Sequence, residues 1–210
     1  MSQFFVIHPE NPQLRLIRQA AGMVREGAVI VYPTDSCYAL GCHLGDKTAM
    51  QRIRQIRGVD ESHHLTLVCR DLSEISHYAR VGNVQFRLMK SNTPGSYTFI
   101  LQATKEVPRR LQHPKRNTIG VRIPDHPIAL ALLEELGEPL LSSTLILPDD
   151  EHRPLNDPDE IRELLERRVD LVIDGGAVGV EPTSIIDLTG ETPELVRKGK
   201  GDVTHFGIED

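Results

Sequence analysis

Short apolar runs that end at Gly or Pro alternate along this chain with segments whose apolar residues recur every three or four positions. The runs predict buried strands, and the longer spacing predicts amphipathic helices. An α/β fold follows, and adjacent helices and clustered late strands favour a mixed sheet over a strictly parallel one. The strands are expected at residues 28–32, 65–69, 97–102, 118–123, 140–143, 169–173, 184–188 and 195–197.

Several helices carry start and stop signals in the sequence. Asn11 is expected to cap an amphipathic helix that has Pro12 at its first position and ends at Gly27. Asp46 is placed to cap a second helix, whose last turn carries Arg57. Further helices are expected at 72–79, 84–90, 128–136 and 161–167, with an exposed loop at 149–154 and a mobile tail after residue 200.

The composition narrows the class of protein. The chain has 210 residues, of which 39% are hydrophobic and 26% charged, as in soluble globular domains. No apolar run approaches the roughly 20 residues that span a bilayer, and the N-terminus lacks a signal-peptide pattern. Three cysteines without a CxxC pair give little support to disulfides or structural zinc. We therefore expect a cytoplasmic protein that does not contact a membrane.

The charges are unevenly distributed along the chain. Residues 47–122 hold 14 Lys and Arg against 5 Asp and Glu, a net charge of +9, whereas residues 123–210 hold 7 against 21, a net charge of -14. A basic middle third in an acidic protein is able to gather its arginines around an anionic ligand. The alternative is a solvated surface whose charges happen to be uneven.

Common catalytic signatures are absent. The sequence has no GxxxxGK[ST] loop, no GxGxxG after a strand, no HExxH and no GxSxG, which disfavours P-loop ATPases and elbow-type serine hydrolases. The spacing of Cys37, Cys42 and His43 matches no common zinc pattern, so no metal ligands are expected. His63 and His64 lie between a basic helix end and a strand, where they contact a ligand or, more commonly, solvent.

Seven motifs occur in a fixed order and resemble those of the YrdC/YciO family. The resemblance extends from about residue 29 to residue 199, within a single domain of residues 1–210. The motifs are PTDSCYALG (33–41), the basic helix through Arg57, PGSYT (94–98), VRIPDHP (121–127), PLLSST (139–144), PTSIIDL (182–188) and VRKG (196–199).

The resemblance implies a YrdC-like twisted α/β domain whose sheet encloses a basic concave cavity. It also implies threonylcarbamoyl-AMP synthase chemistry. That reaction joins L-threonine, bicarbonate and ATP, with Mg²⁺ carried by the ATP, and releases diphosphate in the pathway to N6-threonylcarbamoyladenosine in tRNA. Cationic groups have to neutralise the approaching anions in such a reaction.

The family's site residues carry over to positions of this sequence by the same resemblance. Arg57 and Arg122 are expected as the principal catalytic contacts, with Arg122 paired to the threonine carboxylate. A simpler alternative for Arg122 is a surface ion pair, and for the hydroxyls it is turn formation. The expected substrate contacts are Thr34, Tyr38, Ser142 and Ser184, and the expected nucleotide contacts are Arg57, Thr118, Thr144 and Arg197.

Two positions depart from the family pattern. Val59 replaces the second cation of a lysine-x-arginine pair, and Ile146 replaces the amide of a serine-x-asparagine motif. Losing one charged and one neutral hydrogen bond costs about 2–4.5 kcal/mol, a factor of roughly 30 to 2000 in rate. The resemblance therefore implies reduced or altered activity, for which Arg54 compensates if its side chain points inward.

Two other functions stay open at this point. One is a module that uses the basic cavity to bind double-stranded RNA or tRNA without catalysis. Aromatic residues make up only 4% of the chain and Trp is absent, which favours phosphate contacts over base stacking. The other is a related carbamoylation or nucleotidyl transfer on another amino acid.

Overall fold

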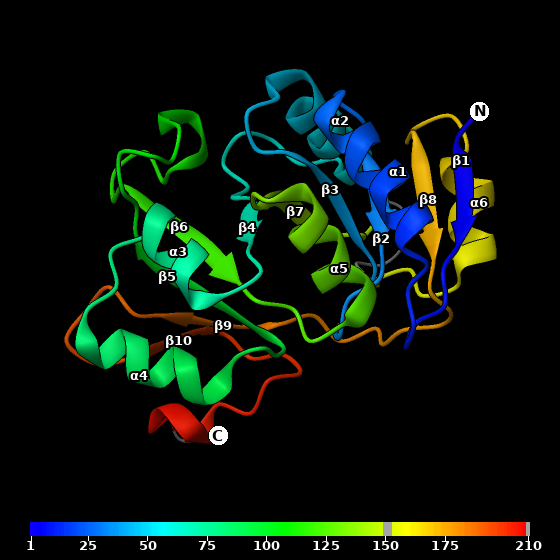
Figure 1. The fold of residues 1–210 in the computed structure, drawn as a ribbon. Helices are drawn as coiled ribbons and strands as arrows, with labels where there is room; N and C mark the ends of the chain where they lie inside the picture. Colours follow the sequence, from blue (N-terminus) through cyan, green and yellow to red (C-terminus); the bar gives the residue numbers. More distant parts are fainter. Residues whose placement is uncertain (149–152, 209–210) are drawn as a thin grey trace.

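The computed structural model describes residues 1–148 and 153–208, and within them ten strands form one twisted sheet (Figure 1). Most of the loop expected at 149–154 lies outside the described residues. The strands, in their order across the sheet, are β1 (Gln3–Val6), β8 (Leu171–Asp174), β2 (Ile30–Tyr32), β3 (Ala39–His43), β7 (Leu140–Thr144), β4 (Thr66–Val68), β6 (Thr118–Arg122), β5 (Tyr97–Gln102), β9 (Ser184–Asp187) and β10 (Glu194–Arg197).

Parallel and antiparallel pairs mix in this sheet. The pairs β1–β8, β8–β2, β4–β6 and β5–β9 are parallel, and the other neighbouring pairs are antiparallel. The prediction of a mixed α/β fold is thus confirmed. Two strands were missed, β1 and β3. The β3 segment Ala-Leu-Gly-Cys-His has no β-branched residue, and its pairing with both β2 and β7 makes it a strand.

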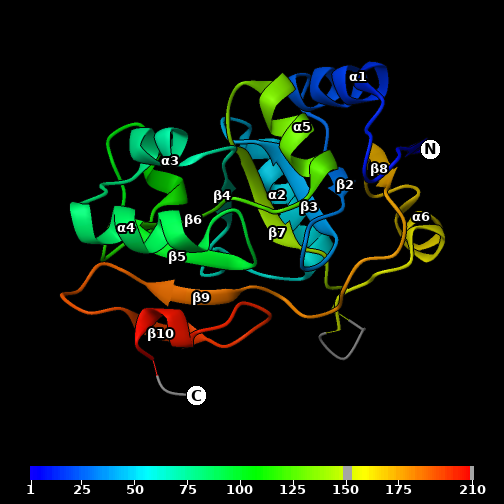
Figure 2. The ribbon, with the colours of Figure 1, turned by 60° about the horizontal axis from the view of Figure 1, so that its bottom comes forward.

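Helices cover both faces of the sheet, but unequally. On one face, α1 (Leu14–Arg25) and α5 (Pro127–Leu136) lie side by side over β2, β8 and β7 (Figure 2). The opposite face is covered along its length by α2 (Lys47–Arg57), α3 (Leu72–Tyr78), α4 (Asn83–Asn92) and α6 (Pro158–Leu165). The first face therefore has no helix over β4, β6, β5 and β9 among the described residues.

Side-chain alternation separates these two faces in every central strand. In β4, Leu67 packs in the large core while Thr66 faces the other side of the sheet. In β5, Phe99 likewise packs in the core and Thr98 faces the other side. The strand register places Thr66 beside Ser142 of β7. The uncovered face thus carries hydroxyl groups.

Helix ends follow the sequence in part. The Asp46 side chain accepts a hydrogen bond from the Ala49 amide and caps α2, as expected. The predicted cap of α1 is wrong, because Gln13 precedes the helix and no side chain caps it. The Gln13 side chain instead accepts a hydrogen bond from the amide of His8.

The segment after residue 200 was expected to be mobile, but as far as residue 208 it packs against the sheet. The ring of Phe206 packs edge-to-face against Tyr97 and at a tilt against Phe99. Ser184 Oγ donates a hydrogen bond to the Gly201 carbonyl. A side chain at Gly199 would place its Cβ 2.2 Å from the Pro182 carbonyl oxygen, so only glycine permits this close approach. In the described part of the chain, no helix has the length and apolarity to cross a membrane.

The contact between α1 and α5 gives a direct test of this packing. Leu132 of α5 is fully buried. We expect Leu132→Ala to lower the free energy of unfolding by about 2–5 kcal/mol, because it removes buried methyl groups and leaves a cavity. Urea denaturation measures this change, with the exposed Glu134→Ala on the same helix as a control expected within about 0.5 kcal/mol. A loss below about 1 kcal/mol for Leu132→Ala would contradict the packing.

Candidate functional site

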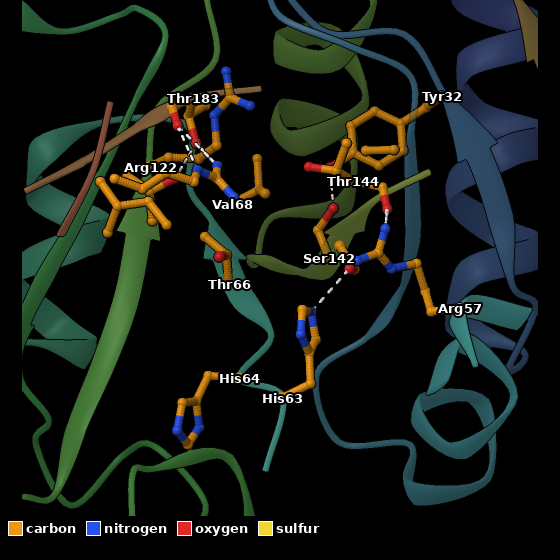
Figure 3. Close-up of a pocket in the computed structure, with 15 residues that line it drawn as sticks. Tyr32, Arg57, His63, His64, Thr66, Val68, Arg122, Ser142, Thr144 and Thr183 are labelled. Carbon is orange, nitrogen blue, oxygen red and sulfur yellow. Dashed lines mark hydrogen bonds between the residues drawn. The ribbon is translucent and has the colours of Figure 1, made fainter. Parts of the chain in front are cut away.

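A cavity lies on the uncovered face of the sheet, where β4, β5, β6, β7 and β9 meet (Figure 3). Its enclosed part is about 120 Å³, and an adjoining, more apolar compartment adds about 220 Å³. Together they reach the lower end of the roughly 300–1,000 Å³ of small-molecule sites. The cavity is lined by Tyr32, Ala39, Arg57, His63, His64, Thr66, Val68, Thr98, Arg122, Ser142, Ser143, Thr144, Thr183, Ile185 and Arg197.

Arg57 reaches the cavity from the last turn of α2. Its Nη1 donates hydrogen bonds to the carbonyl oxygens of Thr144 (2.7 Å) and Ile146 (3.4 Å), which fix the guanidinium at the end of β7. Its Nε is buried and has no hydrogen-bond partner. Burial, and then the charge of Arg197, lower the pKa of Arg57. The residue thus brings a partly desolvated cation to the cavity.

Arg197 enters from β10 on the opposite side. The strand is exposed along its length, but the guanidinium turns back and donates hydrogen bonds to the Thr183 carbonyl at 3.3 and 2.8 Å. This partial burial lowers the pKa of Arg197. Backbone carbonyls, which carry no net charge, therefore hold both Arg57 and Arg197, and no carboxylate in the described part of the chain pairs with either cation.

Arg122 lies at the end of β6 and is almost completely buried. It forms an ion pair with Asp35 and donates to Ser36 Oγ at 3.2 Å, while its Nε has no partner. Asp35 also accepts hydrogen bonds from Ser96 Oγ and the Asp125 amide. The pair is internal, so the alternative of a surface ion pair is wrong. Asp35, which the sequence did not single out, is the residue that holds Arg122.

The hydroxyl groups of the cavity form two local pairs. Ser142 Oγ donates to the Leu40 carbonyl at 2.8 Å, so Tyr32 Oη donates to Ser142 at 2.7 Å. Burial raises the pKa of Tyr32 to about 12. The hydroxyls of Thr98 and Thr183 are 2.9 Å apart and form the second pair. These groups are neutral at physiological pH and are able to orient a ligand without adding charge.

Two histidines complete the wall. His63 Nε2 lies 3.5 Å from Ser143 Oγ, and the rings of His64 and His113 are 4.9 Å apart. Burial is the main cause that lowers the pKa of His63 and of His64, and nearby arginines add to it. His63 is half-buried in the cavity wall, so the preferred interpretation of an exposed pair is wrong for it, whereas His64 is exposed, as that interpretation expects. The HH pair after a basic helix was the available signal.

The structure brings five of the expected site residues together around the cavity. These are Arg57, Arg122, Ser142, Thr144 and Arg197. Thr118 lines the adjoining compartment, with Gly120, Ile100 and Arg116. Thr66 and Thr98 were missed, although each alternates with apolar neighbours in a predicted strand.

Three expected contacts do not line the cavity. Thr34 Oγ1 donates to the Cys37 carbonyl at 2.6 Å and so forms the turn that carries Asp35. Tyr38 Oη donates to the Gly176 carbonyl at 2.7 Å. Ser184 is fully buried against the C-terminal segment. The hydrogen bonds of these hydroxyls are used inside the protein, which places the three residues behind the wall and not on it.

The two positions that depart from the family pattern also lie outside the lining. Val59 is half-buried after α2, and Ile146 forms an isolated bridge with Pro154. Arg54 is not among the lining residues either, so its side chain does not replace the missing cation.

No carboxylate is among the described residues that line the cavity, and no cluster of metal-ligating side chains occurs in the described part of the chain. Hard cations such as Mg²⁺ prefer oxygen ligands, above all carboxylates and phosphates. The cavity walls therefore do not fit a metal ion held by the protein itself. They fit an anion.

Comparisons with known proteins agree with this geometry. Residues 22–199 match a family model, Sua5/YciO/YrdC, whose description is "Telomere recombination". The chain belongs to the Sua5/YciO/YrdC family. It is 62% identical to Escherichia coli (strain K12) YciO over 98% of this chain and 100% of that protein. The crystal structure of E. coli YciO matches with a TM-score of 0.94 over the same shares of the two chains.

Other members of the Sua5/YciO/YrdC family carry the name of an enzyme. A threonylcarbamoyl-AMP synthase of Halorhodospira halophila is 30% identical over 81% of this chain and 89% of that protein. The crystal structure of Pyrococcus abyssi Sua5 complexed with L-threonine matches with a TM-score of 0.86 at 27% identity, over 94% of this chain and 58% of that one. The predicted membership of the family is confirmed.

The buried pair of Arg122 and Asp35 gives the test of this site's framework. We expect Asp35→Asn to lower the free energy of unfolding by about 3–5 kcal/mol, because the amide keeps the shape but leaves the Arg122 charge uncompensated. Urea denaturation measures it. The control is Glu135→Gln, which breaks an exposed pair with Arg18 and should cost about 1 kcal/mol or less. Equal effects of the two substitutions would contradict the analysis.

Proposed function

We propose that this protein is a threonylcarbamoyl-AMP synthase-like enzyme of reduced or altered activity. Its substrates would be L-threonine, bicarbonate and ATP, and its products threonylcarbamoyl-AMP, diphosphate and the water that is lost when the threonine amine and bicarbonate form a carbamate. The observation that carries the proposal is the convergence of three guanidinium groups on one cavity that has no carboxylate in its described lining. Each of the three substrates carries negative charge, and such a cavity attracts them together.

The two sides of the cavity suit different ligands. Among the described residues, no carboxylate pairs with Arg57 or Arg197, and with Thr144 they would bind the phosphates of ATP. Thr118 lies in the more apolar compartment, which suits the nucleoside. Arg122 and Ser142, which both line the cavity, would bind the amino acid, with the guanidinium group of Arg122 near its carboxylate. The L-threonine complex of P. abyssi Sua5 supports an amino-acid site in this fold.

The chemistry requires a carbamate oxygen to attack the α-phosphate of ATP while diphosphate leaves. Two anions have to approach each other, so the guanidinium groups would reduce their repulsion and stabilise the charge that develops. The neutral hydroxyls would fix the orientation of the reactants. Mg²⁺, bound to the ATP phosphates, supplies further neutralisation when the nucleotide is present.

The direct test is synthesis. The purified protein is incubated with radiolabelled threonine, bicarbonate and Mg-ATP beside an active synthase of the family. We expect a labelled adenylate that forms slowly and requires all three substrates. The absence of product at high protein concentration, with the active synthase succeeding alongside, would contradict the proposal. Labelled product from another amino acid alone would indicate the related carbamoylation.

A binding experiment tests the role of Arg57 separately. Saturating Mg-ATP at about 100 times its Kd should stabilise the fold by about 2.7 kcal/mol in a thermal unfolding experiment. We expect Arg57→Met to abolish most of this stabilisation, because it removes a phosphate contact. Arg54→Met, on the same helix but outside the cavity lining, is the matched control and should keep it. Equal stabilisation of both variants would contradict the role of Arg57.

RNA binding without catalysis is the competing function, and an RNA-binding experiment at several salt concentrations tests it. Binding of tRNA or double-stranded RNA that weakens steeply with salt, and that ATP and threonine leave unchanged, would favour a module without catalysis. Competition between RNA and ATP would instead indicate that both use the cavity.

The reduced activity has its own test. Ile146 lies where its carbonyl accepts from Arg57, and Val59 is two residues beyond Arg57. We expect the double variant V59R/I146N to raise the synthase rate by about 30- to 2,000-fold, because it restores one charged and one neutral hydrogen bond. V59L/I146L is the control and should leave the rate low. A V59R/I146N rate equal to that of the control would show that these positions do not limit activity.

A further inference from the structure

The cavity holds a histidine, His63, that lies near the arginines Arg57, Arg54 and Arg197. We propose that His63 is a phosphate-binding residue that takes up a proton when a polyphosphate enters the cavity. The site would then gain another cation only when the ligand is present. The inference rests on the proposed function only in assuming a ligand with two or more linked phosphates.

The geometry places the imidazole of His63 at the ligand. Its side chain lines the cavity, and Figure 3 shows it directed toward the region of Ser142 and Arg57. Its side-chain contact with Ser143 Oγ, at 3.5 Å, is at the limit of a hydrogen bond and leaves the ring able to bind another group. An imidazole in this position would lie beside any phosphate that Arg57 binds.

The charged groups that face His63 come from several elements and are basic. Helix α2 contributes Arg57 and Arg54, β10 contributes Arg197, and the loop itself contributes His64. The carboxylate of Asp60, in the same loop, is turned to Ser62, where it accepts from the amide at 2.8 Å and from Oγ at 2.5 Å. Burial and these cations hold the pKa of His63 below its ordinary value, so the ring is neutral at physiological pH.

A bound polyphosphate would reverse the electrostatic effect on His63. Its charges would compensate Arg57 and Arg197 and would favour an imidazolium that donates a hydrogen bond to a phosphate oxygen. By linkage, a ligand that raises the pKa of a group binds more tightly when that group is protonated. Affinity should therefore rise as pH falls through the pKa of the complex, by up to about tenfold per pH unit, and level off below the pKa of the free protein.

A histidine differs from a permanent cation in one useful respect. A fourth arginine would add repulsion to the empty cavity, which already holds three guanidinium groups. A neutral imidazole adds none until the anion arrives, and it releases its proton again when diphosphate leaves. The same residue thus favours binding without making the free site more strained electrostatically.

The first experiment is an NMR titration of the imidazole resonances of the full-length protein, with and without saturating inorganic diphosphate and without Mg²⁺. The His63 resonance is assigned by its loss in His63→Gln. We expect diphosphate to raise the pKa of His63 by about one unit or more. His77, which is exposed on α3 and outside the cavity, is the internal control and should not move. An unchanged His63 pKa while diphosphate binds, or no binding at all, would overturn the inference.

The second experiment compares affinities for diphosphate at pH 6 and pH 8. Diphosphate itself changes its protonation between these pH values, and dividing the Kd of His63→Gln by the Kd of the wild type at each pH removes this effect. We expect His63→Gln to weaken binding about tenfold at pH 6 and little at pH 8, with His77→Gln equal to wild type at both. A ratio that does not change with pH would contradict proton uptake at His63. If the protein makes no adenylate but the affinity ratio changes with pH, the synthase function is refuted and the role of His63 stands. If the protein makes adenylate but the ratio does not change with pH, the role of His63 is refuted and the synthase function stands.

Discussion

The cavity depends on keeping three like charges close together in a partly buried space. Backbone carbonyls hold Arg57 and Arg197 in place, because they accept the hydrogen bonds of these residues and leave their positive charges unneutralised. Of the three, Arg122 is the one that pairs with a carboxylate in the described part of the chain, and this residue, Asp35, fixes its position. Because the guanidinium groups around the cavity repel one another, the arrangement favours the binding of an anion and lowers the stability of the protein without a ligand. The large core on the opposite face of the sheet supplies the stability that this arrangement requires.

The fold places this cavity by leaving part of one sheet face without a helix. Four helices cover the other face, and α1 with α5 cover only the end formed by β1, β8, β2, β3 and β7 (Figure 2). Beyond that end the strands alternate apolar residues into the core with hydroxyl groups into the cavity. The C-terminal segment then returns beside β9 and carries Arg197 to the opposite wall, where Ser184 and the close approach of Gly199 hold it.

The sequence was informative where its pattern is local or where several motifs reinforce one another. Periodicity located the helices and eight of the strands, and the motif series identified the family and the arginines of the cavity. It failed where tertiary contacts decide: β3 lacks strand-forming residues and is a strand because both its neighbours pair with it. Thr34, Tyr38 and Ser184 lie in family motifs, but a motif does not reveal whether a hydroxyl faces a ligand or a backbone carbonyl. The roles of Asp35 and of the two histidines depend on contacts with residues that are distant in the sequence, and no local pattern predicts such contacts.

The central claim is that one cavity binds a nucleotide and an amino acid side by side, and a crystal structure after soaking with Mg-ATP and threonine tests it most directly. The account expects the phosphates between Arg57 and Arg197, and the amino acid next to Arg122 and Ser142. Ligands bound elsewhere on the surface, or an empty cavity at saturating concentrations of both, would contradict it.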